Sequence, residues 1–273
     1  MNLNSKLFKR IATATVGVIF ILGILIYGGS TGVALFALAA SAAALYEYFI
    51  LLCGEQELWF QRVLGSILGF FLAAIIIFRA SFLYEGICIS FLILFCVYLY
   101  VVHRERGTIE KQFSLLSYSF LGIFYVSFLF SFWPKVRLLE EGVYWIFLVF
   151  IIPWISDTTA YVVGKQWGQA KLSPVISPHK TQEGSIAAIV ASIFAVILYK
   201  IFIFDSISYG GCIYLGGVGS IFGQVGDLFE SFIKRAFSVK DSGVAIPGHG
   251  GILDRFDSVL FCGPFIYFSS FFL

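Results

Sequence analysis

Residues 86–102 read Gly-Ile-Cys-Ile-Ser-Phe-Leu-Ile-Leu-Phe-Cys-Val-Tyr-Leu-Tyr-Val-Val, a stretch without a single Asp, Glu, Lys or Arg. An α-helix needs about 20 predominantly apolar residues to cross the hydrocarbon core of a bilayer. The whole chain has the same character, because 59% of its 273 residues are hydrophobic and only 12% are charged. We therefore predict an integral membrane protein that is built from transmembrane helices.

Similar apolar runs recur along the chain and are separated by short charged segments. They predict an all-α, polytopic fold with about nine transmembrane helices. The least clearly marked features are the short final run and the break between the third and fourth runs. The predicted spans are residues 11–28, 32–53, 63–79, 86–102, 113–133, 143–163, 184–204, 210–230 and 258–273.

The distribution of basic residues predicts the orientation of these spans. With a cytoplasmic N-terminus, only Arg79, Lys135, Arg137 and Lys200 of the 18 Lys and Arg residues fall on the outer side. Cytoplasmic loops of membrane proteins carry an excess of Lys and Arg, so this orientation is favoured. The first apolar run is not followed by a small-x-small cleavage site, which indicates a retained helix rather than a signal peptide. We expect a protein of the inner or plasma membrane with an external C-terminus.

The two halves of the chain differ in their polar content. Residues 1–142 alternate apolar runs with short charged loops, and we interpret them as helices for packing, with lipid or dimer contacts. Residues 143–273 contain almost all the side chains that are useful for chemistry, in predicted cytoplasmic segments at 156–183 and 227–257. Because charge beside hydrocarbon is costly, these segments predict a functional site at the cytoplasmic face.

Two pairs of carboxylates mark the ends of the second polar segment. Asp227 and Glu230 are three residues apart, and Asp254 and Asp257 repeat this spacing. Residues three apart on a helix share a face, so each pair can present its oxygens together. Hard cations such as Mg²⁺ prefer oxygen ligands and often bind substrate phosphates as well. The five cysteines are scattered through apolar runs, so we expect buried thiols and no zinc site.

Cations and glycines lie between these carboxylate pairs. Phosphoryl and nucleotidyl transfer require positive charge around the non-bridging oxygens, and glycine-rich turns can direct backbone N–H groups at an anion. The alternative is a solvated loop whose charges neutralise one another. The candidates for phosphate contact or proton transfer here are Lys234, Arg235, Lys240, His249, Gly250, Gly251 and Arg255.

The first polar segment adds a second group of candidates. Asp157 directly follows an apolar run, and an acid in a membrane segment is a functional candidate by default. The segment 177–181 reads Ser-Pro-His-Lys-Thr, a predicted turn that could hold a phosphate. Alternatively, Thr181 is simply the N-cap of the next helix. Glu47 and Glu85 lie near the ends of apolar runs, and we favour an interfacial role for them. For the glycines of 210–226 we favour close helix packing over contact with a ligand.

The spacing of residues 231–257 resembles the signature of the phosphatidate cytidylyltransferase family, also called CDP-diacylglycerol synthases. It reads Ser-x2-Lys-Arg-x4-Lys-Asp-x-Gly-x3-Pro-x-His-Gly-Gly-x2-Asp-Arg-x-Asp. Segments 157–161 and 177–184 are also similar to blocks of that family. The resemblance implies that CTP and phosphatidic acid react to give CDP-diacylglycerol and pyrophosphate. It also implies Mg²⁺ on Asp227 and Asp254, with Glu230 and Asp257 as further candidates, and a second, monovalent cation such as K⁺.

The resemblance extends to the partners and to the substrate site. It implies a homodimer in the membrane lipid and gives no reason to expect a nucleic-acid partner. The alternative function that the residues leave open is a transporter of phosphate-containing solutes, although transport sites usually lie at the membrane midplane between repeats. The expected substrate-binding residues are Asp157, Ser177, His179, Lys180, Thr181, Asp241, Gly250 and Gly251.

Overall fold

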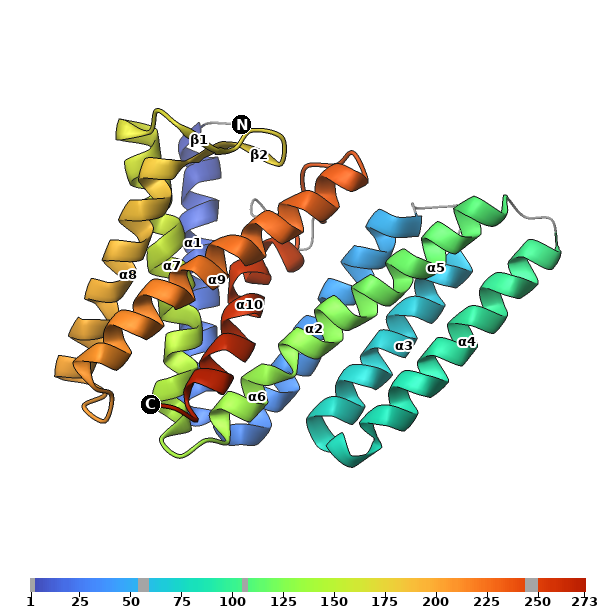
Figure 1. The fold of residues 1–273 in the computed structure, drawn as a ribbon, viewed down its shortest axis with the longest axis horizontal. Coiled ribbons are helices and arrows are strands. Elements are labelled where there is room, and N and C mark those ends of the chain that lie inside the picture. Colours follow the sequence, from blue (N-terminus) through green and yellow to red (C-terminus); the bar gives the residue numbers. More distant parts are fainter. Residues whose placement is uncertain (1–2, 54–58, 105–107, 244–249) are drawn as a thin grey trace.

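The computed structural model describes residues 3–53, 59–104, 108–243 and 250–273, apart from the side chains of residues 3–14 and 53. It is a bundle of long helices with one small antiparallel sheet at one end (Figure 1). The elements are α1 (Leu3–Tyr27), α2 (Gly29–Cys53), α3 (Trp59–Phe78), η1 (Ala80–Phe82), α4 (Leu83–His103), α5 (Ile109–Ile123), η2 (Phe124–Phe128), α6 (Phe132–Arg137), α7 (Gly142–Trp167), β1 (Lys171–Ser173), β2 (Ser177–Thr181), α8 (Gln182–Phe202), α9 (Tyr209–Ala236) and α10 (Leu253–Ser269).

Each predicted apolar span overlaps helical structure, with α5, η2 and α6 together covering the fifth span. Within the described part of the chain, seven helical segments are long and apolar enough to cross a membrane. The part of α1 whose side chains are described, Thr15–Tyr27, is shorter than a span, and so is α10 with 17 residues. The integral membrane class is therefore supported, while the number nine stays a prediction.

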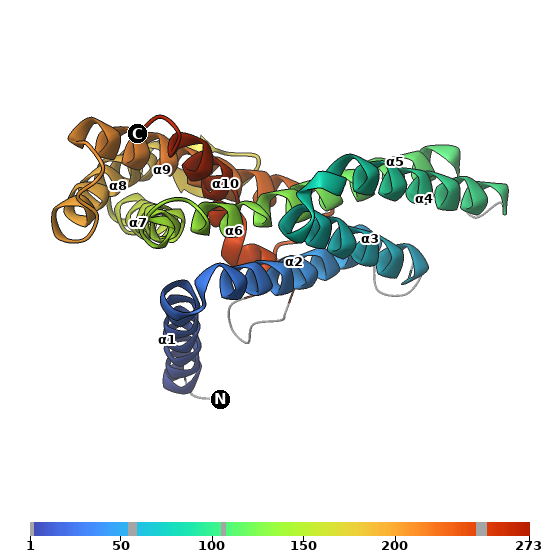
Figure 2. The same ribbon diagram turned by 90° about the horizontal axis from the view of Figure 1, so that it is seen from below.

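The start of α1 and the C-terminus lie at opposite ends of the bundle (Figure 1). The start of α1 is at the same end as the β1–β2 hairpin, and the C-terminus is at the other end (Figure 1). The view from below shows α1 projecting from the body and α3, α4 and α5 forming an extension on one side (Figure 2). The helices α7, α8, α9 and α10 pack against one another at the opposite side of the body.

The two predicted cytoplasmic segments, 156–183 and 227–257, both begin within helices. Helix α7 continues through Asp157 to Trp167 and ends where Gly168 adopts an extended conformation. Helix α9 likewise continues to Ala236. The predicted turn at 177–181 is instead strand β2, which pairs with β1 so that Lys171 lies opposite Thr181. The prediction of an N-cap is confirmed, since Thr181 Oγ1 accepts a hydrogen bond from the Gly184 amide at 3.2 Å.

Glycines of α9 allow close packing against α8, as the sequence predicts. A Cβ atom on Gly216 would lie 2.5 Å from the Cα atom of Ile193 and 2.8 Å from the carbonyl oxygen of Ser192. Contacts to backbone atoms cannot be relieved by a change of rotamer. Close approach of two helices through small residues is a common means of association inside membranes.

Substitution of Gly216 by alanine is therefore expected to destabilise the protein by about 1–3 kcal/mol, as overpacking of a tight interface does. The matched control is Gly217→Ala, because a Cβ there would meet only the side chain of Ile193, at 3.5 Å. Thermal unfolding in detergent should give a lower midpoint for Gly216→Ala than for the control. Equal midpoints would contradict the close packing of α8 and α9.

Candidate active site

Three carboxylates from three helices gather near the hairpin end of the bundle. Asp157 lies on α7, Asp227 on α9 and Asp257 on α10, and the Asp227 charge repels both Asp157 and Asp257. Helices α9 and α10 approach closely here, since a Cβ on Gly226 would lie 2.6 Å from the carbonyl oxygen of Asp257. The glycine before Asp227 thus lets the two acidic helices meet.

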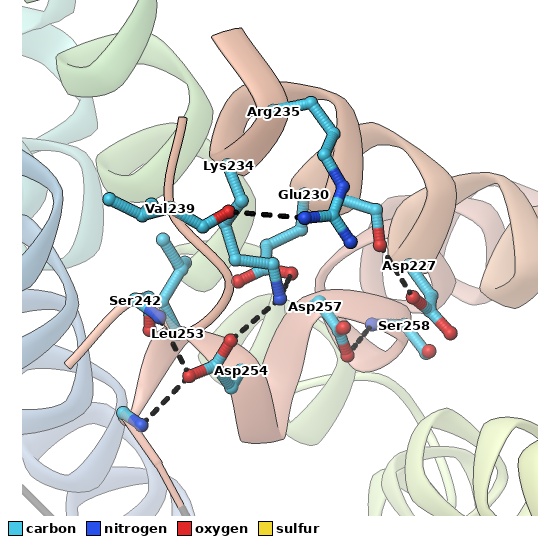
Figure 3. A network of polar contacts seen from close by, with 12 residues as sticks. Asp227, Glu230, Lys234, Arg235, Val239, Ser242, Leu253, Asp254, Asp257 and Ser258 are labelled. Atoms are coloured by element: carbon cyan, nitrogen blue, oxygen red, sulfur yellow. Dashed lines mark hydrogen bonds and ion pairs between the residues drawn. The ribbon is translucent and has the colours of Figure 1, made fainter. Parts of the chain in front are cut away.

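Ser258 joins two of these acids. Its backbone N–H donates to Asp257 Oδ1 at 2.7 Å, and its hydroxyl donates to Asp157 Oδ2 at 3.1 Å (Figure 3 shows the first bond). Ser258 is buried. This residue was not among those predicted from the sequence, although its position directly after Asp257 was a usable signal.

Lys180 supplies positive charge to the carboxylates from the hairpin. Its Nζ atom lies 2.6 Å from Asp227 Oδ2, and both side chains remain about one quarter exposed. The Glu183 carboxylate accepts hydrogen bonds from the amides of Gln169 and Ala170, at 3.1 Å each, which ties the start of α8 to the segment before β1. The hairpin is therefore fixed with Lys180 directed at Asp227.

Lys180 and Asp227 both line a cavity of about 490 Å³. Its lining includes Gln224. The side-chain oxygen of Gln224 accepts a hydrogen bond from the Ser185 hydroxyl, and its NH₂ group donates to Ser220 Oγ at 3.2 Å. The cavity is large enough for a nucleotide or a lipid headgroup, since ligand pockets measure about 300–1,000 Å³. Its lining comprises Asp157, Ala160, Tyr161, Gly164, Lys165, Gly168, Lys171, Leu172, His179, Lys180, Thr181, Ser185, Gln224 and Asp227.

A second network lies deeper between α9 and α10 (Figure 3). The Lys234 ammonium contacts the Glu230 carboxylate and lies 2.7 Å from Asp254 Oδ1. The side chains of Glu230, Asp254 and Lys234 are only 0%, 6% and 14% exposed. Lys234 therefore places one positive charge between two buried acids, and in this structure it does not line the cavity that Lys180 lines.

Asp254 is held by three donors. Besides Lys234, the backbone amides of Ser242 and Gly251 donate to its Oδ2 atom at 2.9 Å each. Burial alone would raise the pKa of Asp254, but its contacts with Lys234, with the Glu230 side chain and with the Gly251 amide outweigh burial and lower the pKa to about 2. Asp254 is thus a carboxylate at neutral pH, and its oxygens are directed at protein donors.

The interpretation of Glu47 as an interfacial residue is wrong. Its side chain is buried, and it accepts hydrogen bonds from the amides of Ile252 and Leu253 at 2.8 and 2.9 Å. The Ser242 hydroxyl donates to it at 3.3 Å. Between 195 and 206 residues separate Glu47 from these partners, and no local pattern could reveal contacts over such a distance.

The other predicted residues lie at the rim of the site or outside it. Arg235 is exposed and donates from Nε to the Ile176 carbonyl oxygen at 3.2 Å, so it links α9 to the hairpin. Lys240, Asp241 and Arg255 are exposed as well. Gly250 has a φ of +86°, a conformation that favours glycine. His249 lies outside the described residues, and Ser177 pairs with Ser173 in the sheet rather than facing the cavity.

The donor set suits a hard cation by its chemistry. Asp157, Asp227 and Asp257 offer only oxygen atoms, and neighbouring carboxylates repel one another unless a positive charge lies between them. Among the described residues, however, no three His, Cys, Asp or Glu side chains are grouped closely enough to hold a metal ion as they stand. In this arrangement the Lys180 ammonium provides positive charge at Asp227.

Comparison with known proteins gives one consistent result. The Cytidylyltransferase family matches residues 8–273. The phosphatidate cytidylyltransferase of Staphylococcus haemolyticus is 34% identical over 270 residues, which are 94% of this chain and 96% of the relative. That of Staphylococcus epidermidis is 36% identical over 259 residues, with the same two coverages. That of Bacillus subtilis is 38% identical over 185 residues, which are 67% of this chain and 69% of the relative.

Proposed function

The chain belongs to the cytidylyltransferase family, and we propose that its cavity between α7, α9 and the hairpin is where CTP and phosphatidic acid become CDP-diacylglycerol and pyrophosphate. The observation that carries this assignment is the Lys180–Asp227 pair, which lines a cavity together with Asp157. Such a cavity combines cations for phosphate oxygens with carboxylates for a metal ion.

The reaction requires one bond to form and one to break. A phosphate oxygen of phosphatidic acid attacks the α-phosphorus of CTP, and the bond from this phosphorus to the pyrophosphate oxygen breaks. The electron pair leaves with pyrophosphate, and the cytidylyl group stays on the lipid. Transfer of this kind depends mainly on positioning and on stabilisation of negative charge, because the lipid itself supplies the nucleophile.

The basic residues of the cavity fit the phosphates of both substrates. Lys165, Lys171 and Lys180 line it, together with His179 at its exposed edge. Ammonium groups bind phosphate oxygens through charge-assisted hydrogen bonds, which are about twice as strong as neutral ones. We assign the triphosphate to these residues and expect Lys180 to exchange part of its contact with Asp227 for a contact with substrate.

A divalent cation such as Mg²⁺ completes the proposal. Asp227 and Asp257 would hold it, with Asp157 beside them, while Asp254 could join only if its bond with Lys234 opened. Such an ion neutralises developing charge on the phosphates when it is bound. The second, monovalent cation and the homodimer that the family resemblance implies stay predictions.

We further propose that the cavity faces the cytoplasm. The start of α1 lies at the same end of the bundle as the hairpin (Figure 1), and the hairpin contributes Lys171, His179 and Lys180 to the cavity. The positive-inside tendency favours the cytoplasm for that side, where CTP is available. The open side of the cavity would then meet a soluble nucleotide and the headgroup of a membrane lipid together.

Pyrophosphate release by the purified protein in mixed micelles tests this function. Release should require CTP, phosphatidic acid and Mg²⁺ together, and it should be much slower when ATP replaces CTP. Diacylglycerol, which lacks the phosphate nucleophile, serves as the matched control lipid. Folded protein that releases pyrophosphate equally well without phosphatidic acid, or not at all, would refute the proposal.

A further inference from the structure

A carboxylate from the first half of the chain reaches the start of α10. Glu47 lies on α2, its side chain is buried, and its two oxygens accept from the backbone amides of Ile252 and Leu253 at 2.8 and 2.9 Å. The Ser242 hydroxyl adds a third contact at 3.3 Å. This is a fully engaged carboxylate rather than an acid at the membrane surface.

Helix α10 needs an acceptor at this position. The first N–H groups of a helix have no partner within it, and a side chain at the N-cap usually supplies one. Ile252 occupies the N-cap of α10, and its apolar side chain makes no capping bond. A negative charge near the N-terminus of a helix is also favourable for the helix dipole. Glu47 therefore caps α10 from another helix.

Two glycines leave the space that this carboxylate occupies. A Cβ atom on Gly243 would lie 2.9 Å from Glu47 Oε1, and one on Gly251 would overlap Glu47 Oε2 and Ser242 Oγ. The sequence marks Gly251 as a candidate for anion binding. The structure shows that any side chain at this position would also collide with the Glu47 carboxylate.

The segment that contacts Glu47 also binds the Asp254 carboxylate and leads along α10 to Asp257. The Ser242 and Gly251 amides donate to Asp254, and Asp257 follows one helical turn later. We infer that Glu47 is a positioning residue for cytidylyl transfer: it fixes the first turn of α10, so that Asp257 meets Asp157 and Asp227. This inference rests on the proposed function of the cavity.

The effect of Glu47 should be on turnover more than on nucleotide binding. Glu47 is absent from the cavity lining, so CTP keeps its contacts when Glu47 is changed. A displaced first turn would move Asp257 relative to the reacting phosphates. Misplacement by about 1 Å can cost about 100-fold in rate.

The test compares Glu47→Gln with Glu85→Gln, which changes an exposed carboxylate in the first half of the chain. The Glu47→Gln variant keeps the shape of the side chain but replaces one acceptor oxygen by an NH₂ group. We expect kcat to fall by about 10- to 100-fold with the KM for CTP within about threefold of wild type. Hydrogen exchange of the Ile252 and Leu253 amides should be about tenfold faster, while that of α8 stays unchanged.

The two readouts separate this inference from the proposed function. If the wild-type protein makes no product, the proposed function fails, and the exchange rates still report on the capping of α10. Unchanged exchange in Glu47→Gln, or faster exchange with an unchanged kcat, would overturn the positioning role. Should Glu47→Gln not fold, Ser242→Ala removes one of the three donors instead. It should lower kcat by a few fold, and full activity would overturn the role.

Discussion

Replacement of Asp227 by asparagine is expected to lower kcat for cytidylyl transfer by about 100- to 1,000-fold, the usual cost of removing a preorganised charge from an active site. Asp227 lies in the cavity and pairs with Lys180 at 2.6 Å. Asparagine keeps the shape of the side chain but loses the charge that would hold both Lys180 and a divalent cation. The measurement is pyrophosphate release over a range of Mg²⁺ concentrations.

A matched control exists at the other end of the molecule. Asp205 also pairs with a lysine, Lys200, at 2.7 Å, but it is 97% exposed and does not line the cavity. It lies in the connection between α8 and α9, at the opposite end of the bundle from the hairpin (Figure 1). The Asp205→Asn variant should retain wild-type turnover. Both variants should unfold at similar temperatures, because Asp227 is partly exposed and its loss leaves no deeply buried charge. Asp227→Asn with more than half of the wild-type kcat would remove Asp227 from the proposed site.

Replacement of Lys234 by methionine is expected to have the largest effect on stability. Lys234 lies between the carboxylates of Glu230 and Asp254, which are 0% and 6% exposed. Without the ammonium, Glu230 loses its charged partner and Asp254 keeps only the backbone amides of Ser242 and Gly251. Breaking a buried ion pair by removing one partner costs about 3–5 kcal/mol. Thermal unfolding in detergent should show a clearly lower midpoint than for wild type.

A second substitution shows whether the loss of stability comes from the missing charge or from the changed shape of the side chain. In Lys234→Met with Glu230→Leu, one uncompensated carboxylate is removed, and much of the lost stability should return. Lys240→Met is the control for loss of a lysine, because Lys240 is exposed. A midpoint for Lys234→Met equal to that of Lys240→Met would show that the buried network does not stabilise the protein.

The sequence predicted the parts of the site that depend on local spacing. Asp227 and Glu230 lie on one helix, and Asp254 and Asp257 lie in the first two turns of another, as their three-residue spacing indicates. The role of Thr181 as N-cap also follows from residue type and position. These features are determined by neighbours along the chain.

Features that depend on distant parts of the chain could not be predicted. Lys234 was expected to meet phosphate, but the fold places it between two buried acids. Glu47 contacts residues about 200 positions away in the sequence. The residues next to it in the sequence give no sign of these contacts. The strands β1 and β2 contain three and five residues, too short to show an alternating pattern.

Transfer of label from CTP to lipid tests the central claim most directly. The purified protein is given CTP labelled at the α-phosphorus, phosphatidic acid and Mg²⁺, and the lipid phase is then extracted. Label should appear in the lipid phase as CDP-diacylglycerol with wild-type protein, and Asp227→Asn should leave it in the aqueous phase. Label that stays in the aqueous phase with folded wild-type protein, or that reaches the lipid equally well with Asp227→Asn, would contradict the assignment of this cavity as the site of cytidylyl transfer.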